Sequence, residues 1–221
     1  MENQKHNSDS YIIAAILFFI GGYQNTYTYL NCGKIFANLQ TGNMVLMSIN
    51  FAQGNYTLAL RYLVPLSCFV LGCIVGTIFN IKFKKKIRMH WRSPLLLIEM
   101  ICVIVVGFIP DEYDLISAAI ITFNSALSLE AFRTVEKRPL PTTMMIGNMR
   151  KCVDHLTRYV ILHKKEDLKE FVIIFTLLLT FLIGCVVMAY INTYLNLKSI
   201  LVLIPLYIFA ILYIEIDKQI I

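Results

Sequence analysis

The chain has 221 residues, of which 57% are hydrophobic and only 15% are charged, and its formal net charge is +6. Soluble domains are about 45–50% apolar and about 25% charged, and a soluble chain of this length cannot bury so much apolar surface. The mean hydropathy of +0.66 excludes a disordered chain as well. We therefore predict an integral membrane protein, with the lipid bilayer as its main partner.

The positive charge does not indicate a nucleic-acid-binding protein. The basic residues lie between apolar runs, where membrane proteins carry their orientation signals, and no basic face interleaved with aromatic residues is present. The six cysteines form no CxxC pair and no metal-ligand spacing, so we expect them to pack as small hydrophobic residues. The sequence predicts no metal, no cofactor and no nucleic-acid partner.

Six apolar runs approach the roughly 20 residues that a membrane-spanning helix needs. We expect the first run to be a retained helix, because no A-x-A-like cleavage site follows it. Pro65 and Pro205 lie inside runs and predict kinks, whereas the spacing of Gly72 and Gly76 predicts close helix packing within the chain. In chain order the runs are residues 11–30, 58–80, 94–109, 115–132, 170–191 and 199–216.

Two further segments, residues 36–52 and 141–163, each carry a Gly-Asn-Met sequence and are less apolar. The second segment contains Arg150, Asp154 and Arg158, and such charges are costly near the centre of a bilayer. Its apolar residues recur at helical spacing, which predicts an amphipathic helix at the interface or dipping into the bundle. We expect two short Gly-Asn helices beside the six membrane helices.

The distribution of positive charge favours six crossings over eight. If neither Gly-Asn segment crosses, only Lys34, Arg61 and Lys198 of the 20 lysine and arginine residues fall on one side. If both cross, the basic residues divide almost evenly. The positive-inside rule favours the first arrangement, with six crossings and both termini in the cytoplasm.

Short matching sequences indicate an internal repeat. The halves, about residues 11–110 and 115–216, would each hold three crossings and one Gly-Asn segment, within a single transmembrane domain that comprises residues 1–221. Because three is odd, the halves would have opposite orientations, as in many secondary transporters; the alternative is a chance match between hydrophobic runs. The matches, in order, are residues 14–17 with 118–121, 42–44 with 147–149, and 69–73 with 181–185.

Polar residues gather in corresponding places of the two halves and define a candidate substrate site. Glycine permits close backbone approach, asparagine offers a donor and an acceptor, and an exposed helix start favours an anionic group. The alternative is hydrogen bonding between helices without a ligand. The candidate residues are Asn25, Gln40, Thr41, Gly42, Asn43, Glu99, Glu130, Thr143, Gly147, Asn148 and Arg150.

Two of these candidates are acidic and lie within or at the end of apolar runs. A carboxyl in a low-dielectric environment can exchange protons, or it can pair permanently with a cation. For Glu130 we favour pairing, because Arg133 and Arg150 are close in the sequence. For Glu99 both alternatives stay open.

The motifs resemble a known family. Residues 27–30 (YTYL) with 36–46 (FANLQTGNMVL), and residues 131–133 (AFR) with 142–150 (TTMMIGNMR), are similar to the two hallmarks of the YoaK-like bacterial membrane proteins. The resemblance spans about residues 11–216 and implies an all-α bundle of about six membrane helices in the bacterial cell membrane. It implies no activity. Many members carry an aspartate where Asn25 stands, so the resemblance does not extend proton coupling to that position.

From these patterns we expect a small secondary transporter of a polar or anionic solute. The alternative is a non-transporting membrane protein with an assembly or regulatory role. An intramembrane enzyme ranks third, and we expect no enzyme, because the sequence has no Ser/His/Asp order, phosphate loop or HExxH motif. No residue pattern indicates an oligomeric state.

Overall fold

The computed structural model describes residues 10–83, 90–135, 138–141 and 145–219, and these residues confirm the prediction of an all-helical chain. The described residues form no β-strand, and an isolated β-bridge joins Val135 and Arg138. The helices are α1 (Tyr11–Asn31), α2 (Gln40–Ala52), α3 (Tyr56–Phe83), α4 (Ser93–Val106), η2 (Asp111–Tyr113), α5 (Asp114–Ala131), α6 (Met145–Leu162), α7 (Lys165–Leu195), η3 (Asn196–Leu203) and α8 (Ile204–Gln219).

The helix boundaries follow local sequence signals. Ser10 caps α1, because its side chain accepts a hydrogen bond from the backbone N–H of Ile13. Pro65 lies inside α3, as predicted. Pro205 instead occupies the first turn of α8, where the N–H that proline lacks would have no helical partner. The last apolar run is therefore divided into the 3₁₀ helix η3 and the α-helix α8.

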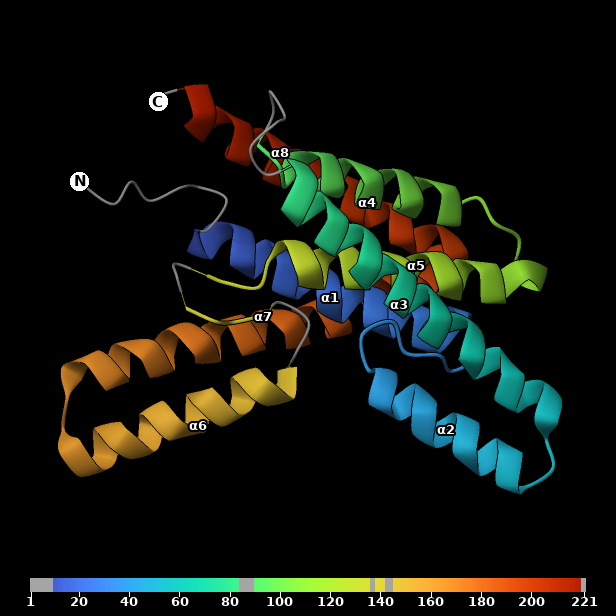
Figure 1. Ribbon diagram of the computed structural model, residues 1–221, viewed down its shortest axis with the longest axis horizontal. Helices are drawn as coiled ribbons and strands as arrows, with labels where there is room; N and C mark the ends of the chain where they lie inside the picture. Colours follow the sequence, from blue (N-terminus) through green and yellow to red (C-terminus); the bar gives the residue numbers. More distant parts are fainter. Residues whose placement is uncertain (1–9, 84–89, 136–137, 142–144, 220–221) are drawn as a thin grey trace.

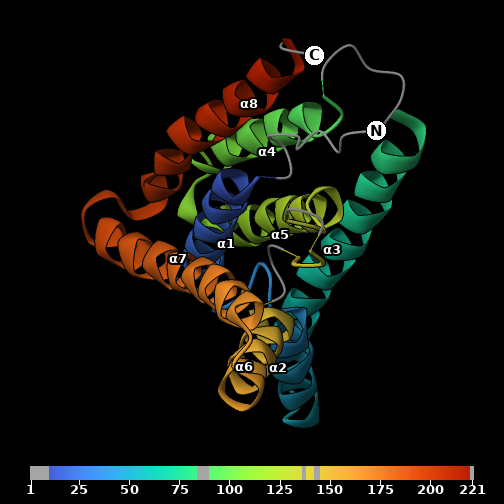
Figure 2. The ribbon, with the colours of Figure 1, turned by 90° about the vertical axis from the view of Figure 1, so that its left-hand side faces the viewer.

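The main helix contacts join the first four α-helices (α1–α4) to the last four (α5–α8), an arrangement that we call crosswise packing. α1 packs along α7 and α3 packs along α5, while α2 folds back on α3 and α6 folds back on α7. In Figure 1 the α2–α3 turn lies at the right-hand end of the molecule and the α6–α7 turn at the left-hand end. Both views show α2 and α6 at the lower edge of the bundle (Figure 2), and Figure 1 shows them apart from each other along that edge.

Corresponding glycines make the two main helix crossings possible. A Cβ atom on Gly184 of α7 would overlap with the carbonyl oxygen of Phe19 on α1. A Cβ atom on Gly72 of α3 would lie 2.6 Å from the carbonyl oxygen of Phe123 on α5. Gly72 and Gly184 align in the sequence repeat, and so do Phe19 and Phe123. A glycine-on-carbonyl contact thus occurs at both crossings, and the α1–α7 crossing has a second one, between Gly22 and the carbonyl oxygen of Phe181.

Many apolar side chains lie on the surface of the molecule, and several polar side chains lie in its interior. Large apolar side chains such as Val70 of α3 and Val186 of α7 are exposed, while Gln24, Glu99 and Asn124 are almost completely buried. A soluble monomer rarely exposes extended apolar surface. Two helical stretches of the described part are long and apolar enough to cross a membrane, namely Tyr56–Lys82 and Lys165–Ile216. The other predicted runs contain the buried polar residues or, in α4, only 14 helical residues.

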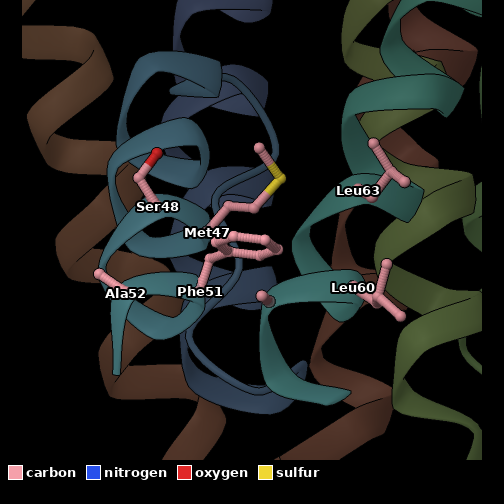
Figure 3. Close-up of a pocket in the computed structure, with 7 residues that line it drawn as sticks. Met47, Ser48, Phe51, Ala52, Leu60 and Leu63 are labelled. Carbon is pink, nitrogen blue, oxygen red and sulfur yellow. The ribbon is translucent and has the colours of Figure 1, made fainter. Parts of the chain in front are cut away.

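A groove of about 490 Å³ opens between α2 and α3. Figure 3 shows Met47 and Phe51 of α2 on one side of the groove and Leu60 and Leu63 of α3 on the other. Because Ser48 carries the only side-chain polar atom among the lining residues, the groove offers little to a polar solute. Its lining is Met47, Ser48, Phe51, Ala52, Ala59, Leu60 and Leu63.

Candidate functional site

A chain of buried hydrogen bonds links three helices in the middle of the molecule. The hydroxyl of Tyr207 on α8 donates to Oε2 of Glu99 on α4 over 3.2 Å. The same hydroxyl accepts a hydrogen bond of 3.0 Å from Nε2 of Gln24 on α1. All three side chains are at most 2% exposed. The helices α1, α4 and α8 thus bring an acid, a phenol and an amide into direct contact.

The helix α5 extends this polar centre from its other side. Nδ2 of Asn124 donates to the backbone oxygen of Glu99 over 2.9 Å. Oγ of Ser125 lies 3.4 Å from Oε1 of Gln24 and 3.0 Å from the Ile121 carbonyl oxygen. We call Gln24, Glu99, Asn124, Ser125 and Tyr207 the central polar cluster.

Several oxygen atoms in or beside the central polar cluster have no hydrogen-bond partner. They are Oε1 of Glu99, Oδ1 of Asn124 and Oγ1 of Thr122. In the described part of the chain, no ion pair includes Glu99. Unpaired buried acceptors are costly, so the cluster can hold a proton or a ligand that donates hydrogen bonds.

The first Gly-Asn segment is a structural anchor. Oδ1 of Asn43 accepts from the backbone N–H of Phe36 over 2.9 Å, and Nδ2 donates to the Phe36 carbonyl over 2.7 Å. Nδ2 also lies 3.0 Å from Oε1 of Gln40, whose own Nε2 donates to the carbonyl of Ala37. The amide of Asn43 therefore fastens the preceding loop to the start of α2, with its polar atoms fully used.

The second Gly-Asn segment repeats half of this anchor. Nδ2 of Asn148 donates to the carbonyl of Pro141 over 2.8 Å, again to the residue seven positions earlier. Proline has no backbone N–H, and Oδ1 of the buried Asn148 has no partner. The two asparagines occupy corresponding places, but only Asn43 has a saturated amide.

The remaining candidates in the first half lie around the same loop. Oδ1 of Asn25 accepts from the backbone N–H of Asn38 over 3.1 Å. Gly42 lies in the first turn of α2, in contact with the side chains of Phe36 and Leu39, whereas Thr41 is exposed. These residues support the loop, and the side-chain hydrogen bonds of Asn25 and Gln40 are made with that loop and with Asn43.

The candidates in the second half do not converge with those in the first. Glu130 pairs with Arg133 and accepts a hydrogen bond of 3.0 Å from Thr77, so the pairing alternative describes it. Gly147 and Arg150 are exposed on α6. Thr143 lies outside the described residues.

Sequence reasoning missed the contribution of Tyr207 and underrated Gln24. Tyr207 stands in an apolar run without a polar neighbour, so only its packing against α4 identifies it. Gln24 is a polar residue of the first apolar run, next to Asn25, but it is not among the predicted site residues. The described residues contain no group of three or more His, Cys, Asp or Glu side chains that could hold a metal ion.

Comparison with known proteins identifies the family. No curated protein and no solved structure matches the chain. A family model matches residues 13–214, which is nearly the whole chain and includes all of the central polar cluster. The chain therefore belongs to the family described as protein of unknown function (DUF1275).

Proposed function

We propose that this chain is a small secondary transporter of a polar or anionic solute in the bacterial cell membrane. The observation that carries the proposal is the central polar cluster, which lies where helices of the first half (α1 and α4) meet helices of the second (α5 and α8). Transporters bind substrate and coupling ions at the interface between repeats, near the bilayer midplane. A protein that only needed packing would gain little from a buried acid with a free oxygen.

The proposal includes an inverted repeat, and the crosswise packing supports it. In an inverted repeat, a half-turn would exchange the α1–α7 crossing with the α3–α5 crossing, and the contacts of Gly184 with those of Gly72; both crossings and both contacts are present. In Figure 1, α1 and α5 run in opposite directions across the middle of the molecule. A half-turn about an axis in the membrane plane would produce this relation.

We further propose six crossings, by α1, α3, α4, α5, α7 and α8, with α2 and α6 as short helices that do not cross. The α6–α7 turn lies at the end of the molecule where α1 begins and α8 ends (Figure 1). Lys164 and Lys165 at that turn belong to the positively charged side, which the positive-inside rule assigns to the cytoplasm. Both termini are then cytoplasmic.

The experiment is a metabolite comparison between a deletion strain and strains that express the chain. Wild-type protein should restore the intracellular level of at least one polar or anionic metabolite. Gln24→Leu should fail to restore it at equal protein level, because the substitution removes the amide that contacts Tyr207. Ser67→Ala is the matched control, since Ser67 is exposed and bonds only the Leu63 carbonyl of its own helix.

The outcomes separate the transporter from the alternative of a non-transporting assembly or regulatory protein. Identical metabolite profiles in the deletion and wild-type strains contradict transport. Full complementation by Gln24→Leu would mean that the function does not depend on the amide of Gln24 in the central polar cluster, and it would favour the alternative.

A further inference from the structure

We propose that Glu99 binds a proton at the boundary between the two halves, with Tyr207 and Gln24 as positioning residues. The inference rests on the proposed function and deepens it, since a proton bound there would be the coupling ion of the transporter. Two sets of observations carry it, namely the surroundings of the carboxyl group and the helices that supply its partners.

The surroundings of the Glu99 carboxyl group favour its neutralisation by one positive charge. Glu99 is 1% exposed, and one of its oxygens accepts a hydrogen bond from Tyr207 while the other has no partner. The hydroxyl of Ser128 lies beside the same carboxyl group. An ionised carboxylate buried without a cation costs several kcal/mol. A bound proton removes that charge. On Oε1, the oxygen without a partner, it would also make the carboxyl group a hydrogen-bond donor.

The chemistry of the neighbours favours a proton over a metal ion. Hard metal cations take six or more oxygen ligands, commonly from several carboxylates. Glu99 is the only carboxylate in the central polar cluster. Tyr207 donates to one of its carboxyl oxygens, whereas Asn124 donates to its backbone carbonyl oxygen. A single buried carboxyl group, with no ion pair among the described residues, suits a single proton.

Few charged or titratable groups face Glu99. Tyr207 on α8 and Cys102 on α4 are its titratable neighbours. Asn124 and Ser128 on α5 do not titrate, and Lys198 on η3 is exposed. Within the same helices, Arg92 donates to the Ala131 carbonyl and Glu215 accepts from Ser93, both at the N-terminal end of α4.

The hydrogen bonds of Glu99 cross the boundary between the halves. Glu99 and Gln24 belong to the first half, whereas Tyr207 belongs to the second, and its hydroxyl bridges them. A movement that separates Tyr207 from Glu99 or from Gln24 would break these bonds. Proton binding at Glu99 changes the charge on one partner, which links protonation to the relative position of the halves.

The test is infrared difference spectroscopy of the purified full-length chain in liposomes while the pH is varied. This measurement needs no known substrate. We expect the carbonyl stretching band of a protonated carboxyl group to appear on acidification and to be lost in Glu99→Gln. Tyr207→Phe should keep the band but shift its frequency, because the hydrogen bond from the phenol is removed. The Tyr207→Phe result also serves if Glu99→Gln folds poorly.

Glu130→Gln is the matched control, because Glu130 pairs with Arg133 and not with the central polar cluster, so this substitution should leave the Glu99 band in place. Absence of the band in the wild-type chain, or its persistence in Glu99→Gln, overturns the proposal. Suppression of the band by sodium but not by potassium would also overturn it, in favour of a sodium site. A Glu99 band without any metabolite effect leaves proton binding intact and contradicts only the transporter, so the two failures are distinguishable.

Discussion

At the scale of single residues, the corresponding asparagines Asn43 and Asn148 make different numbers of hydrogen bonds in the two halves. Asn43 and Asn148 both contact the residue seven positions earlier, but that residue is Phe36 in one half and Pro141 in the other. Phenylalanine offers both a backbone donor and an acceptor, whereas proline offers only an acceptor. The sequence match between the Gly-Asn segments therefore reflects a shared loop anchor, and the substrate role that we predicted for these residues stays a prediction.

We predict that Asn43→Ala destabilises the chain more than Asn148→Ala does. The first substitution strands the N–H and carbonyl of Phe36 and should lower stability by about 3 kcal/mol; the second strands one carbonyl, at about 1 kcal/mol. The measurement is the loss of folded protein on heating in detergent, compared at equal starting amounts. Equal losses for the two variants would contradict the anchor account.

At the scale of helices, the positions of the glycines decide how closely the main pairs pack. Gly72 and Gly184 lie against backbone carbonyls of the facing helix. At Gly147, by contrast, a Cβ atom would meet no neighbouring atom within 4 Å. Small residues allow such close approach between membrane helices, where packing and not the hydrophobic effect drives association.

We predict that Gly72→Ala and Gly184→Ala each lower stability by about 3 kcal/mol, because the added methyl group forces the crossing helices apart. Gly147→Ala is the matched control, and it should be neutral or stabilising by up to about 1 kcal/mol, since alanine favours the helix. Thermal unfolding in detergent checks all three variants. A Gly147→Ala effect as large as that of Gly184→Ala would be the contrary result.

Most helices could be predicted from hydrophobic runs, and the exception has a physical reason. The predicted run 58–80 corresponds to α3 (Tyr56–Phe83) within a few residues. Residues 199–216 were predicted as one helix, but the chain forms the 3₁₀ helix η3 before α8 begins at Ile204. Hydropathy does not distinguish a 3₁₀ turn from an α-helix, and Pro205 marks a helix start as well as a kink.

The central polar cluster shows why a site is harder to predict than helices. Glu99 was predicted as a site residue because a carboxyl group stands out in an apolar run. Tyr207 does not stand out, because tyrosine is common in membrane segments, and its contact with Glu99 joins residues 108 positions apart. Only the packing of α4 against α8 brings the pair together.

For the whole molecule, the crosswise packing predicts that the two halves depend on each other. Residues 1–109 and 110–221 should each be degraded when expressed alone, since α3 and α7 would lose their partners α5 and α1. Expressed together as two chains, they should co-purify, because the break falls in the short connection between α4 and η2. A first half that accumulates alone as a folded protein would contradict the account.

The central claim is that the chain crosses the membrane six times, with α2 and α6 not crossing. Labelling of single cysteines with a membrane-impermeant thiol reagent tests it directly, in a background where the six native cysteines are replaced. Glu112→Cys and Lys198→Cys should react in intact cells, whereas Lys82→Cys and Lys165→Cys should react only after the cells are opened; all four positions are exposed on the molecule. Labelling of Lys82→Cys from outside would mean that α2 crosses, and labelling of Lys165→Cys from outside with Lys82→Cys still protected would mean that α6 crosses. Either result would contradict the six-crossing account.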